Sequence, residues 1–268
     1  MASTPPIRWA VRDEGAGRPV LLLHGFSGTS DAWDEHGADL VARHRILVPS
    51  LPGHGGTTAP PEAISVEATA DALAELLAAR DAVPAHVVGY SLGARVALRL
   101  AVAHPDVVDR LVLESPSAGL PTEAERAARR AADEALAVRL ETQGIERFVD
   151  EWERNPVFAG TALEPDRAAQ VREMRLGNDP AGLAASLRLA GQGSMAPLFD
   201  ALPAIGVPTL VITGALDPIG RPRAERVATA IPGARLAIVD GAGHTPHDER
   251  PEAFRRLVHA FLEEEPTP

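Results

Sequence analysis

A serine stands between two glycines, directly after a short apolar run, in the segment 89–93, which reads Gly-Tyr-Ser-Leu-Gly. A segment rich in Ala, Leu and Arg, which predicts a helix, follows at once. The pattern G-x-S-x-G at such a junction holds the serine hydroxyl exposed on a sharp turn. Glycine suits both flanking positions because it has no Cβ to clash with the tightly turned backbone. The pattern is short enough to arise by chance, so its place between a predicted strand and a predicted helix is what makes Ser91 a candidate for chemistry.

An aspartate and a histidine complete the set of residue types that activates a serine. Asp217 follows the apolar run 209–213, and His244 follows the run 236–240. The carboxyl edge of a parallel sheet is where such sheets bind ligands, and the order Ser, Asp, His suits a nucleophile placed there. In such a triad the histidine takes the serine proton while the aspartate orients the imidazole. Each residue has an ordinary structural alternative as a helix cap, a turn residue or a surface residue, but their joint order predicts a catalytic triad.

The rest of the chain alternates predicted strands with predicted helices, which indicates an α/β fold with a mostly parallel sheet. Several runs are continuously apolar, as expected for strands covered on both faces. Strands are predicted near 7–12, 19–24, 45–49, 85–90, 110–115, 208–213 and 234–240. Helices are predicted near 31–43, 66–80, 91–103, 221–230 and 250–263. Between about 118 and 200 no strand is predicted, and four further helices are expected near 122–141, 144–153, 164–176 and 180–191.

We interpret these four helices as a cap that is inserted into a single core. In the core, helices flank the sheet on both sides. The core is assigned to residues 1–117 and 201–268, and the cap to residues 118–200. The alternative is that the four helices only extend the layer that covers the sheet. A chain of 268 residues is long enough for a single α/β unit with a substantial core.

These motifs together resemble the α/β-hydrolase superfamily over nearly the whole chain. The segment 20–28 reads as a buried strand that opens into a His-Gly loop. In that superfamily this loop and the residue after the nucleophile each supply one backbone N–H of an oxyanion hole. The resemblance assigns these donors to Phe26 and Leu92, and it places His24 at the site as the residue that shapes the loop. Ser50 stands where the superfamily's D-x-P-G-x-G loop has its aspartate.

Composition argues against several kinds of partner and cofactor. The formal net charge of −11 opposes binding to nucleic acid or to an anionic membrane. The chain has no cysteine, so it forms neither disulfides nor thiolate metal sites. Histidine spacing suggests no metal site, and no phosphate-binding glycine loop is present, so neither a metal nor another cofactor is expected. No apolar leader or spanning run is seen, so insertion into a membrane is not expected and the cytoplasm is the expected location.

The predicted cap sharpens the resemblance. The segment 148–158, with a Trp, a polar spacer, then Pro and Phe, resembles the cap of the 2-succinyl-6-hydroxy-2,4-cyclohexadiene-1-carboxylate synthase family. The segment 172–178 resembles that family's next cap motif, an arginine before an Asn-containing turn. The segment 89–95 resembles its serine turn, with an arginine four residues after the serine, and the segment 24–33 resembles its His-Gly loop. Ala94, where a second glycine is usual, is a departure from the family pattern.

This second resemblance implies a lyase of menaquinone biosynthesis. The family eliminates pyruvate from 2-succinyl-5-enolpyruvyl-6-hydroxy-3-cyclohexene-1-carboxylate. Ser91, activated by His244, would abstract a ring proton, and the oxyanion donors would stabilise an enolate-like oxygen. One alternative is a hydrolase acting on an ester, lactone or carbon–carbon bond of a small carboxylated metabolite, and another is a non-enzymatic binding protein on this fold. Fold and triad do not set the reaction, but the cap motifs favour the lyase and the intact triad argues against the binding protein.

The implied partner is a small anionic substrate with several carboxylates, and arginine binds carboxylates bidentately through its planar fork. Arg95 is expected to face the substrate because it lies one helical turn after Ser91 on the same face. The other predicted substrate-binding residues are Tyr90, Arg129, Arg130, Trp152 and Arg175. Their alternatives are ion pairs on a solvated helix face or packing within the cap. Glu114, which also ends a predicted strand, is the weaker candidate for the triad acid, and His247 is expected to have a structural role. The chain is expected to be a monomer or a weak homo-oligomer.

Overall fold

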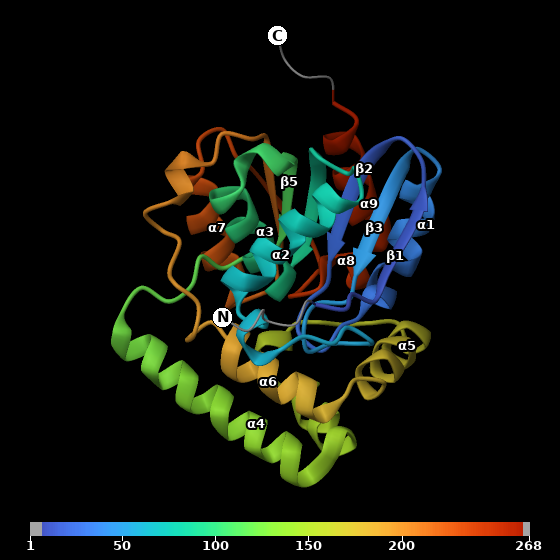
Figure 1. Ribbon diagram of the computed structural model, residues 1–268. Helices are drawn as coiled ribbons and strands as arrows, with labels where there is room; N and C mark the ends of the chain where they lie inside the picture. The colour runs from blue at the N-terminus through green and yellow to red at the C-terminus, as the bar shows by residue number, and fades with distance from the viewer. Residues whose placement is uncertain (1–6, 265–268) are drawn as a thin grey trace.

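The computed structural model describes residues 7–264, and its centre is a seven-stranded sheet (Figure 1). The strand order is β1-β3-β2-β4-β5-β6-β7. Neighbouring strands pair in parallel except β1, which is antiparallel to β3. The strands are β1 (Val11–Gly15), β2 (Arg18–Leu23), β3 (His44–Pro49), β4 (Ala85–Tyr90), β5 (Val108–Glu114), β6 (Thr209–Gly214) and β7 (Arg235–Val239).

Helices connect these strands and cover both faces of the sheet. None of the described helices is long and apolar enough to cross a bilayer. The predicted α/β class is confirmed, and most predicted elements agree with the observed ones to within a few residues. The helices are α1 (Asp34–Val41), α2 (Val66–Ala79), α3 (Leu92–Ala103), α4 (Glu123–Trp152), α5 (Pro165–Leu176), α6 (Pro180–Ala190), α7 (Gly220–Ala230), α8 (Pro246–Glu249) and α9 (Pro251–Leu262).

The first strand is a correction to the sequence prediction. It was expected at 7–12, but β1 begins at Val11, and before it Arg8 forms only an isolated bridge with Thr58. β1 is a polar edge strand, so it lacks the apolar pattern that marks a buried strand. Instead, Asp13 accepts hydrogen bonds of 2.8 Å from both Nε and Nη2 of Arg45 on the neighbouring strand. This pairing fixes the edge of the sheet without an apolar face.

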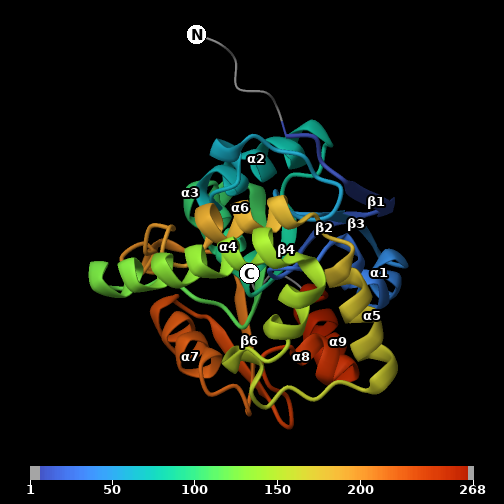
Figure 2. The same cartoon turned by 90° about the horizontal axis from the view of Figure 1, so that it is seen from below.

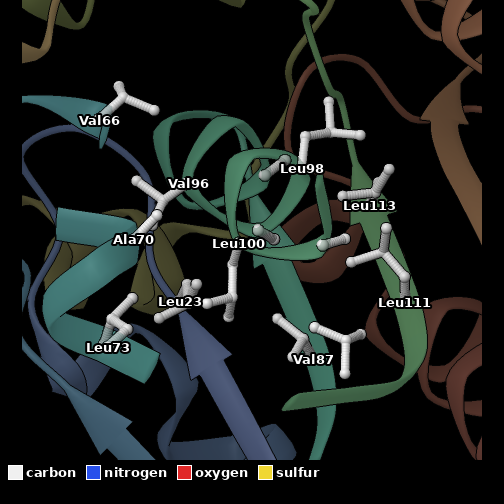
Figure 3. Close-up of a cluster of buried hydrophobic side chains, with 14 of the residues drawn as sticks. Leu23, Val66, Ala70, Leu73, Val87, Val96, Leu98, Leu100, Leu111 and Leu113 are labelled. Carbon is white, nitrogen blue, oxygen red and sulfur yellow. The ribbon is translucent and has the colours of Figure 1, made fainter. Parts of the chain in front are cut away.

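Alternate residues of the central strands face opposite sides of the sheet, which is why these strands read as continuously apolar. In β2, Leu21 and Leu23 pack in a cluster with residues of α2, α3 and α7. Val20 and Leu22 pack in a second cluster with residues of α1 and α9. Figure 3 shows part of the first cluster, in which strand and helix side chains interdigitate around Leu100. Strands held between two apolar layers give the loops at their ends a rigid base.

The chain between β5 and β6 contains α4, α5 and α6, which lie beyond one end of the sheet (Figures 1 and 2). The two predicted helices 122–141 and 144–153 form one long segment, α4, whose helical geometry is broken at Gly144 (φ 84°, ψ 172°). A separate apolar cluster joins the two parts of α4, before and after Gly144, to α6, and it includes Leu140, Phe148 and Leu183. These helices therefore pack as a layer of their own, while the assignment of 118–200 as a separate domain stays a prediction.

Candidate active site

The strand β4 turns sharply into α3 at Ser91, whose backbone lies in the left-handed region (φ 50°, ψ −101°). Its N–H donates to the Glu114 carbonyl oxygen at 2.9 Å, which ties the turn to β5. A Cβ at Gly89 would lie 2.5 Å from the Gly93 carbonyl oxygen, and a Cβ at Gly93 would lie 2.2 Å from that of Leu23. Only glycine fits at these two positions, so the turn needs both glycines of the motif. A strained backbone at a serine is typical of a functional site.

The three residues of the predicted triad lie together at the carboxyl ends of β4, β6 and β7. His244 Nδ1 lies 2.6 Å from Asp217 Oδ2, and His244 Nε2 lies 3.3 Å from Ser91 Oγ. Because an ionised carboxylate only accepts, Nδ1–H donates to Asp217 and Nε2 is left to accept the serine proton. The arrangement has the connectivity that a proton transfer from serine to imidazole needs.

The carboxylate of Asp217 is held charged although it is almost fully buried. Burial acts to raise its pKa, but the hydrogen bond and charge of His244 and the backbone N–H groups of Gly220 and Ile219 hold that pKa below its usual value. Gly220 N–H donates to Asp217 Oδ1 at 2.6 Å. Asp217 therefore has one oxygen for the imidazole and the other for the first turn of α7, which fixes its orientation.

The loop that carries His244 is braced by a buried glutamate. Glu249 Oε2 accepts from the N–H of Gly243 at 2.8 Å and from the N–H of Ala162 at 3.1 Å. Its Oε1 accepts from the N–H of Thr245 at 2.9 Å. Ala162 lies in the segment between α4 and α5, so one carboxylate joins that segment to both neighbours of His244. Sequence reasoning did not single out Glu249.

The histidine loop and the segment before α5 also contact each other directly. His244 N–H donates to Thr161 Oγ1 at 3.3 Å. A Cβ at Gly243 would lie 2.8 Å from the backbone nitrogen of Thr161. The backbones are therefore packed too closely for a side chain, and the position of His244 depends on the segment that precedes α5.

A cavity of about 480 Å³ opens over Ser91 and His244. Its wall combines residues from the core with residues from α4, α6 and the 3₁₀ turn Pro156–Phe158. Five arginines and two acidic residues are among those that line it: Arg95, Arg129, Arg139, Arg154, Arg223, Asp133 and Glu151. The cavity thus carries an excess of positive charge inside a chain whose formal net charge is −11.

The residues that carry the two predicted oxyanion donors, Phe26 and Leu92, line the same cavity as Ser91. Within residues 7–264, neither of their backbone N–H groups donates to another backbone carbonyl or to a side chain. Leu92 is the first residue of α3, where N–H groups have no partner inside the helix. Both N–H groups therefore lack an acceptor within the described residues, which is the requirement for donating to the oxygen of a bound substrate.

His24 does not line the cavity, although the sequence placed it at the substrate site. It is fully buried, and its Nε2 accepts from Leu51 N–H at 2.8 Å while its Nδ1 donates to the Gly25 carbonyl oxygen at 2.8 Å. Burial lowers its pKa to about 4, so its ring is neutral near pH 7. His24 braces the loop that carries Phe26, which is the loop-shaping role expected of it, and it has no route to a substrate.

Among the predicted arginines, Arg95 and Arg129 line the cavity. Arg95 is 7% exposed, and its Nη1 donates to the Ala190 carbonyl oxygen at 2.7 Å. Arg129 Nε donates to Asp133 Oδ1 at 2.8 Å. Arg95 therefore also joins α3 to the end of α6, so its side chain supports the wall that it lines.

Arg130 and Arg175 are not among the residues that line the cavity. Arg130 donates to the Gly193 carbonyl oxygen at 2.8 Å and to Glu123 at 2.5 Å. Arg175 forms an ion pair with Glu153 at 3.3 Å and lies over the ring of Phe158 at 5.3 Å from its centroid. The structure therefore shows these two arginines in roles that stabilise α4 and α5. Phe158, whose ring lies under the Arg175 guanidinium, does line the cavity, whereas Arg175 does not.

The two predicted aromatic residues line the cavity. The Tyr90 ring lies 5.7 Å from the ring of His244. The Trp152 ring packs against Phe26 at 5.1 Å. The Nε1 donor of Trp152 is buried and finds no acceptor within the described residues. A buried donor without a partner carries a cost for the folded state.

Arg223 lines the cavity and was missed by sequence reasoning. It lies in the first turn of α7, six residues after Asp217. Its neighbour Arg221 faces elsewhere and pairs with Glu225 at 2.9 Å. Its position six residues after Asp217 is the sequence signal for a place near the site. That signal identifies Arg223 only when the start and the orientation of α7 are known.

The alternative acid, Glu114, does not contact His244. Its Oε1 accepts from the backbone N–H of His247 at 2.8 Å and lies 2.9 Å from His247 Nδ1. Burial opposes a charge on His247, but the carboxylates of Asp248 and Glu114 outweigh it and raise the pKa of His247 to about 9. Glu114 and His247 therefore form a buried ion pair next to Tyr90, in agreement with the structural role expected for His247.

No group of three or more His, Asp or Glu side chains within the described ranges is placed to hold a metal ion. The site instead combines a Ser-His-Asp arrangement, two free backbone donors and an arginine-rich cavity. This geometry suits chemistry in which a serine oxygen exchanges a proton and negative charge develops on an oxygen atom.

Comparison with known proteins places the chain in a class that has this fold. Residues 20–257 match the model of the alpha/beta hydrolase family. The chain therefore belongs to the alpha/beta hydrolase family and is an enzyme of that family. The predicted resemblance to this superfamily is confirmed.

Within the family, the chain is similar to curated proteins named 2-succinyl-6-hydroxy-2,4-cyclohexadiene-1-carboxylate synthase. It is also similar to solved structures with other descriptions, such as an esterase from Thermogutta terrifontis at 29% identity, a TM-score of 0.82 and coverage of 96% of this chain and 93% of that chain. A Bacillus subtilis (strain 168) protein provisionally named 2-succinyl-6-hydroxy-2,4-cyclohexadiene-1-carboxylate synthase is 36% identical over 96% of this chain and 95% of its own length. The protein of that name from Salmonella agona (strain SL483) is 33% identical over 88% and 90%. A solved structure described as MenH from S. aureus superposes with a TM-score of 0.90 at 30% identity, covering 95% of this chain and 97% of that chain.

Proposed function

We propose that this enzyme is a lyase that eliminates pyruvate from 2-succinyl-5-enolpyruvyl-6-hydroxy-3-cyclohexene-1-carboxylate. The product is 2-succinyl-6-hydroxy-2,4-cyclohexadiene-1-carboxylate, an intermediate of menaquinone biosynthesis. The relatives described above support this choice within the family. The observation that carries it furthest is the arginine-rich wall of the cavity over Ser91, because the substrate has three carboxylates and the chain as a whole is acidic.

The reaction begins with two proton transfers. His244 Nε2 takes the proton of Ser91 Oγ, while Asp217 stabilises the imidazolium that forms. The serine oxygen then takes the proton from ring carbon 2, which is acidified by the adjacent succinyl carbonyl. The electron pair left on carbon 2 delocalises onto that carbonyl oxygen. The backbone N–H groups of Phe26 and Leu92 are the donors that would stabilise this oxygen.

Elimination completes the reaction without water. The electron pair makes the single bond between ring carbons 2 and 3 a double bond, the existing double bond between carbons 3 and 4 moves to carbons 4 and 5, and the bond from carbon 5 to the enolpyruvyl oxygen breaks. The leaving enolate takes up the proton that was removed and becomes pyruvate. Neither an acyl-enzyme nor a hydrolytic water is needed, so the Ser-His-Asp arrangement serves as a base rather than as a nucleophile.

Pyruvate release from this substrate, coupled to NADH oxidation by lactate dehydrogenase, tests the proposal. Deuterium at ring carbon 2 should slow release severalfold at a rate limited by chemistry, because that bond breaks when Ser91 acts. Ser91→Ala should release pyruvate far more slowly. The proposal fails if the wild-type enzyme forms no pyruvate, or if Ser91→Ala forms it at the wild-type rate.

A further inference from the structure

Three arginines from separate elements line the same cavity. Arg95 comes from α3, Arg129 from α4 and Arg223 from α7. Burial, with repulsion from Arg129 and Arg223, lowers the pKa of Arg95 to about 9. Burial, followed by repulsion from Arg129, also lowers the pKa of Arg223. The three positive charges therefore lie within one another's electrostatic field.

The surrounding acidic groups do not balance these three charges. Asp133 is the acidic residue that lines the cavity beside them, and only its Oδ1 accepts from Arg129, while Oδ2 has no partner within residues 7–264. The charges of Asp217 and Glu125 also reach Arg223. However, the Asp217 carboxylate is already engaged by His244 and the N–H of Gly220. Glu125 lies outside the cavity wall, where it accepts from Thr122 at the start of α4. Arg223 itself has neither an ion pair nor a hydrogen bond with another part of the described chain.

Like charges in a partly buried pocket repel one another, and burial adds a cost for each charge that lacks a partner. Arg95 and Arg129 have acceptors in the protein, whereas Arg223 has none among the described residues. With Asp133 ionised, the three arginines leave an excess of two positive charges. A bound group with two carboxylates would neutralise this excess, and arginine is the side chain that best matches carboxylates.

We infer that Arg223 extends the predicted substrate-binding arginines, Arg95 and Arg129, into a subsite for a second carboxylate of the substrate, and that Arg223 determines the preference for that carboxylate. This inference rests on the proposed function, whose substrate carries carboxylates on the ring, the succinyl chain and the enolpyruvyl group. Arg223 is close in sequence to Asp217, so the subsite lies on the side of the cavity where the triad acid is anchored. The core itself, and not only the segment between β5 and β6, then selects the substrate.

Direct titration of the full chain tests the subsite without any turnover. The probe is 2-succinylbenzoate, the aromatic analogue of the product with two carboxylates, and its dimethyl ester is the neutral match. Arg223→Gln should weaken binding of the dicarboxylate about ten- to a hundredfold, the typical effect of one charge-assisted contact. The same variant should change binding of the diester by less than about twofold. In the pyruvate assay, KM should rise more than kcat falls.

Arg221→Gln is the matched control, because Arg221 is on the same helix, carries the same charge and does not line the cavity. It should leave both affinities unchanged. Arg223→Lys should retain part of the affinity, since an ammonium keeps the charge but loses the fork. Thermal unfolding curves check that each variant is folded. Wild-type affinity in Arg223→Gln and Arg223→Lys, or an equal loss in Arg221→Gln, would overturn the subsite.

The two proposals can fail separately. If the wild-type enzyme releases pyruvate and Arg223→Gln binds the dicarboxylate normally, the subsite is wrong and the proposed function stands. If no pyruvate is released but binding of the dicarboxylate depends on Arg223, the proposed function is wrong and the subsite stands.

Discussion

Ser91 and His244 depend on each other for chemistry, because neither the hydroxyl nor the neutral imidazole is a strong base at carbon by itself. The contact from His244 Nδ1 to Asp217 is 2.6 Å long, and the contact from Nε2 to Ser91 Oγ is 3.3 Å long. The shorter contact fixes the imidazole tautomer, and the longer one leaves the serine hydroxyl room to reorient toward a substrate. Removal of any one residue therefore disables the same proton transfer.

We predict that Ser91→Ala, His244→Ala and Asp217→Asn each lower kcat for pyruvate release by roughly a thousandfold or more. Residues that act as one unit are not additive, so the Ser91→Ala/His244→Ala double variant should be little slower than Ser91→Ala alone. Steady-state kinetics on folded variants measures both effects. Losses that multiply in the double variant would mean that the two residues act separately.

At the scale of elements, the junction of β4 and α3 holds the serine by close backbone packing. A Cβ at Gly93 would lie 2.2 Å from the Leu23 carbonyl oxygen, and backbone atoms cannot move aside as a flexible side chain can. The turn is therefore fixed by the sheet itself, and the helix α3 begins where the strand allows it.

We predict that Gly93→Ala destabilises the fold by about 1–3 kcal/mol, the usual cost of forcing an extra group into a packed core. It should also lower kcat because the turn at Ser91 shifts. Gly177→Ala is the control, since a Cβ there would meet its nearest atoms at an ordinary 3.5 Å. Urea unfolding measures the difference. Equal stability of the two variants would show that the junction tolerates a side chain.

The histidine loop is positioned by Glu249, whose carboxylate accepts hydrogen bonds from residues on both sides of His244 and from Ala162. We predict that Glu249→Gln lowers kcat by roughly ten- to a hundredfold, because a small displacement of a catalytic group has that effect. The affinity for 2-succinylbenzoate should change little. Glu252→Gln, at an exposed position on α9, is the control. If Glu249→Gln retains wild-type kcat, the loop does not need this brace.

The elements differ in how far the sequence predicts them. Apolar strands such as β2 and β4 were predicted to within about a residue, because burial on both faces leaves a continuous pattern. The polar edge strand β1 was misplaced, since pairing by side chains such as Asp13 and Arg45 has no period to detect. Element order, likewise, predicted which strand ends bring the triad together.

Side-chain direction was much harder to predict than element order. Arg129 lines the cavity and its neighbour Arg130 does not, because successive residues on a helix face about 100° apart. The sequence could not tell which of the two faces inward without the orientation of α4. For the same reason Arg223 was overlooked, and Arg175 was assigned to a cavity that it does not line.

At the scale of the whole molecule, buried histidines make stability depend on pH in two directions. Burial lowers the pKa of His24 and His86 to about 4, and of His36 and His54 to about 3, from an ordinary value of 6.5. The unfolded chain takes up protons at these histidines below about pH 6.5, whereas the folded chain does not, so stability falls as pH drops. His247 has a raised pKa of about 9, so its contribution is complete below pH 6.5 and is lost as pH rises through 9.

We therefore predict that the free energy of unfolding is greatest near pH 6.5 and declines on both sides. Replacement of His54 by Gln should flatten the acidic decline, and replacement of His247 by Gln should flatten the alkaline one. Urea unfolding at a series of pH values measures both limbs. If the free energy of unfolding instead rises as the pH is lowered from 6.5 to 4, these histidines are not held neutral in the folded state.

The central claim is that a Ser-His-Asp arrangement typical of hydrolases here acts as a base for elimination. The most direct test compares two activities of one enzyme preparation: pyruvate release from the enolpyruvyl substrate and release of p-nitrophenol from p-nitrophenyl butyrate. We predict that kcat/KM for pyruvate release exceeds that for the ester by several orders of magnitude, and that the ester gives no rapid burst of one p-nitrophenol per enzyme. Fast ester turnover with such a burst, together with no pyruvate, would contradict the account and identify the enzyme as a hydrolase.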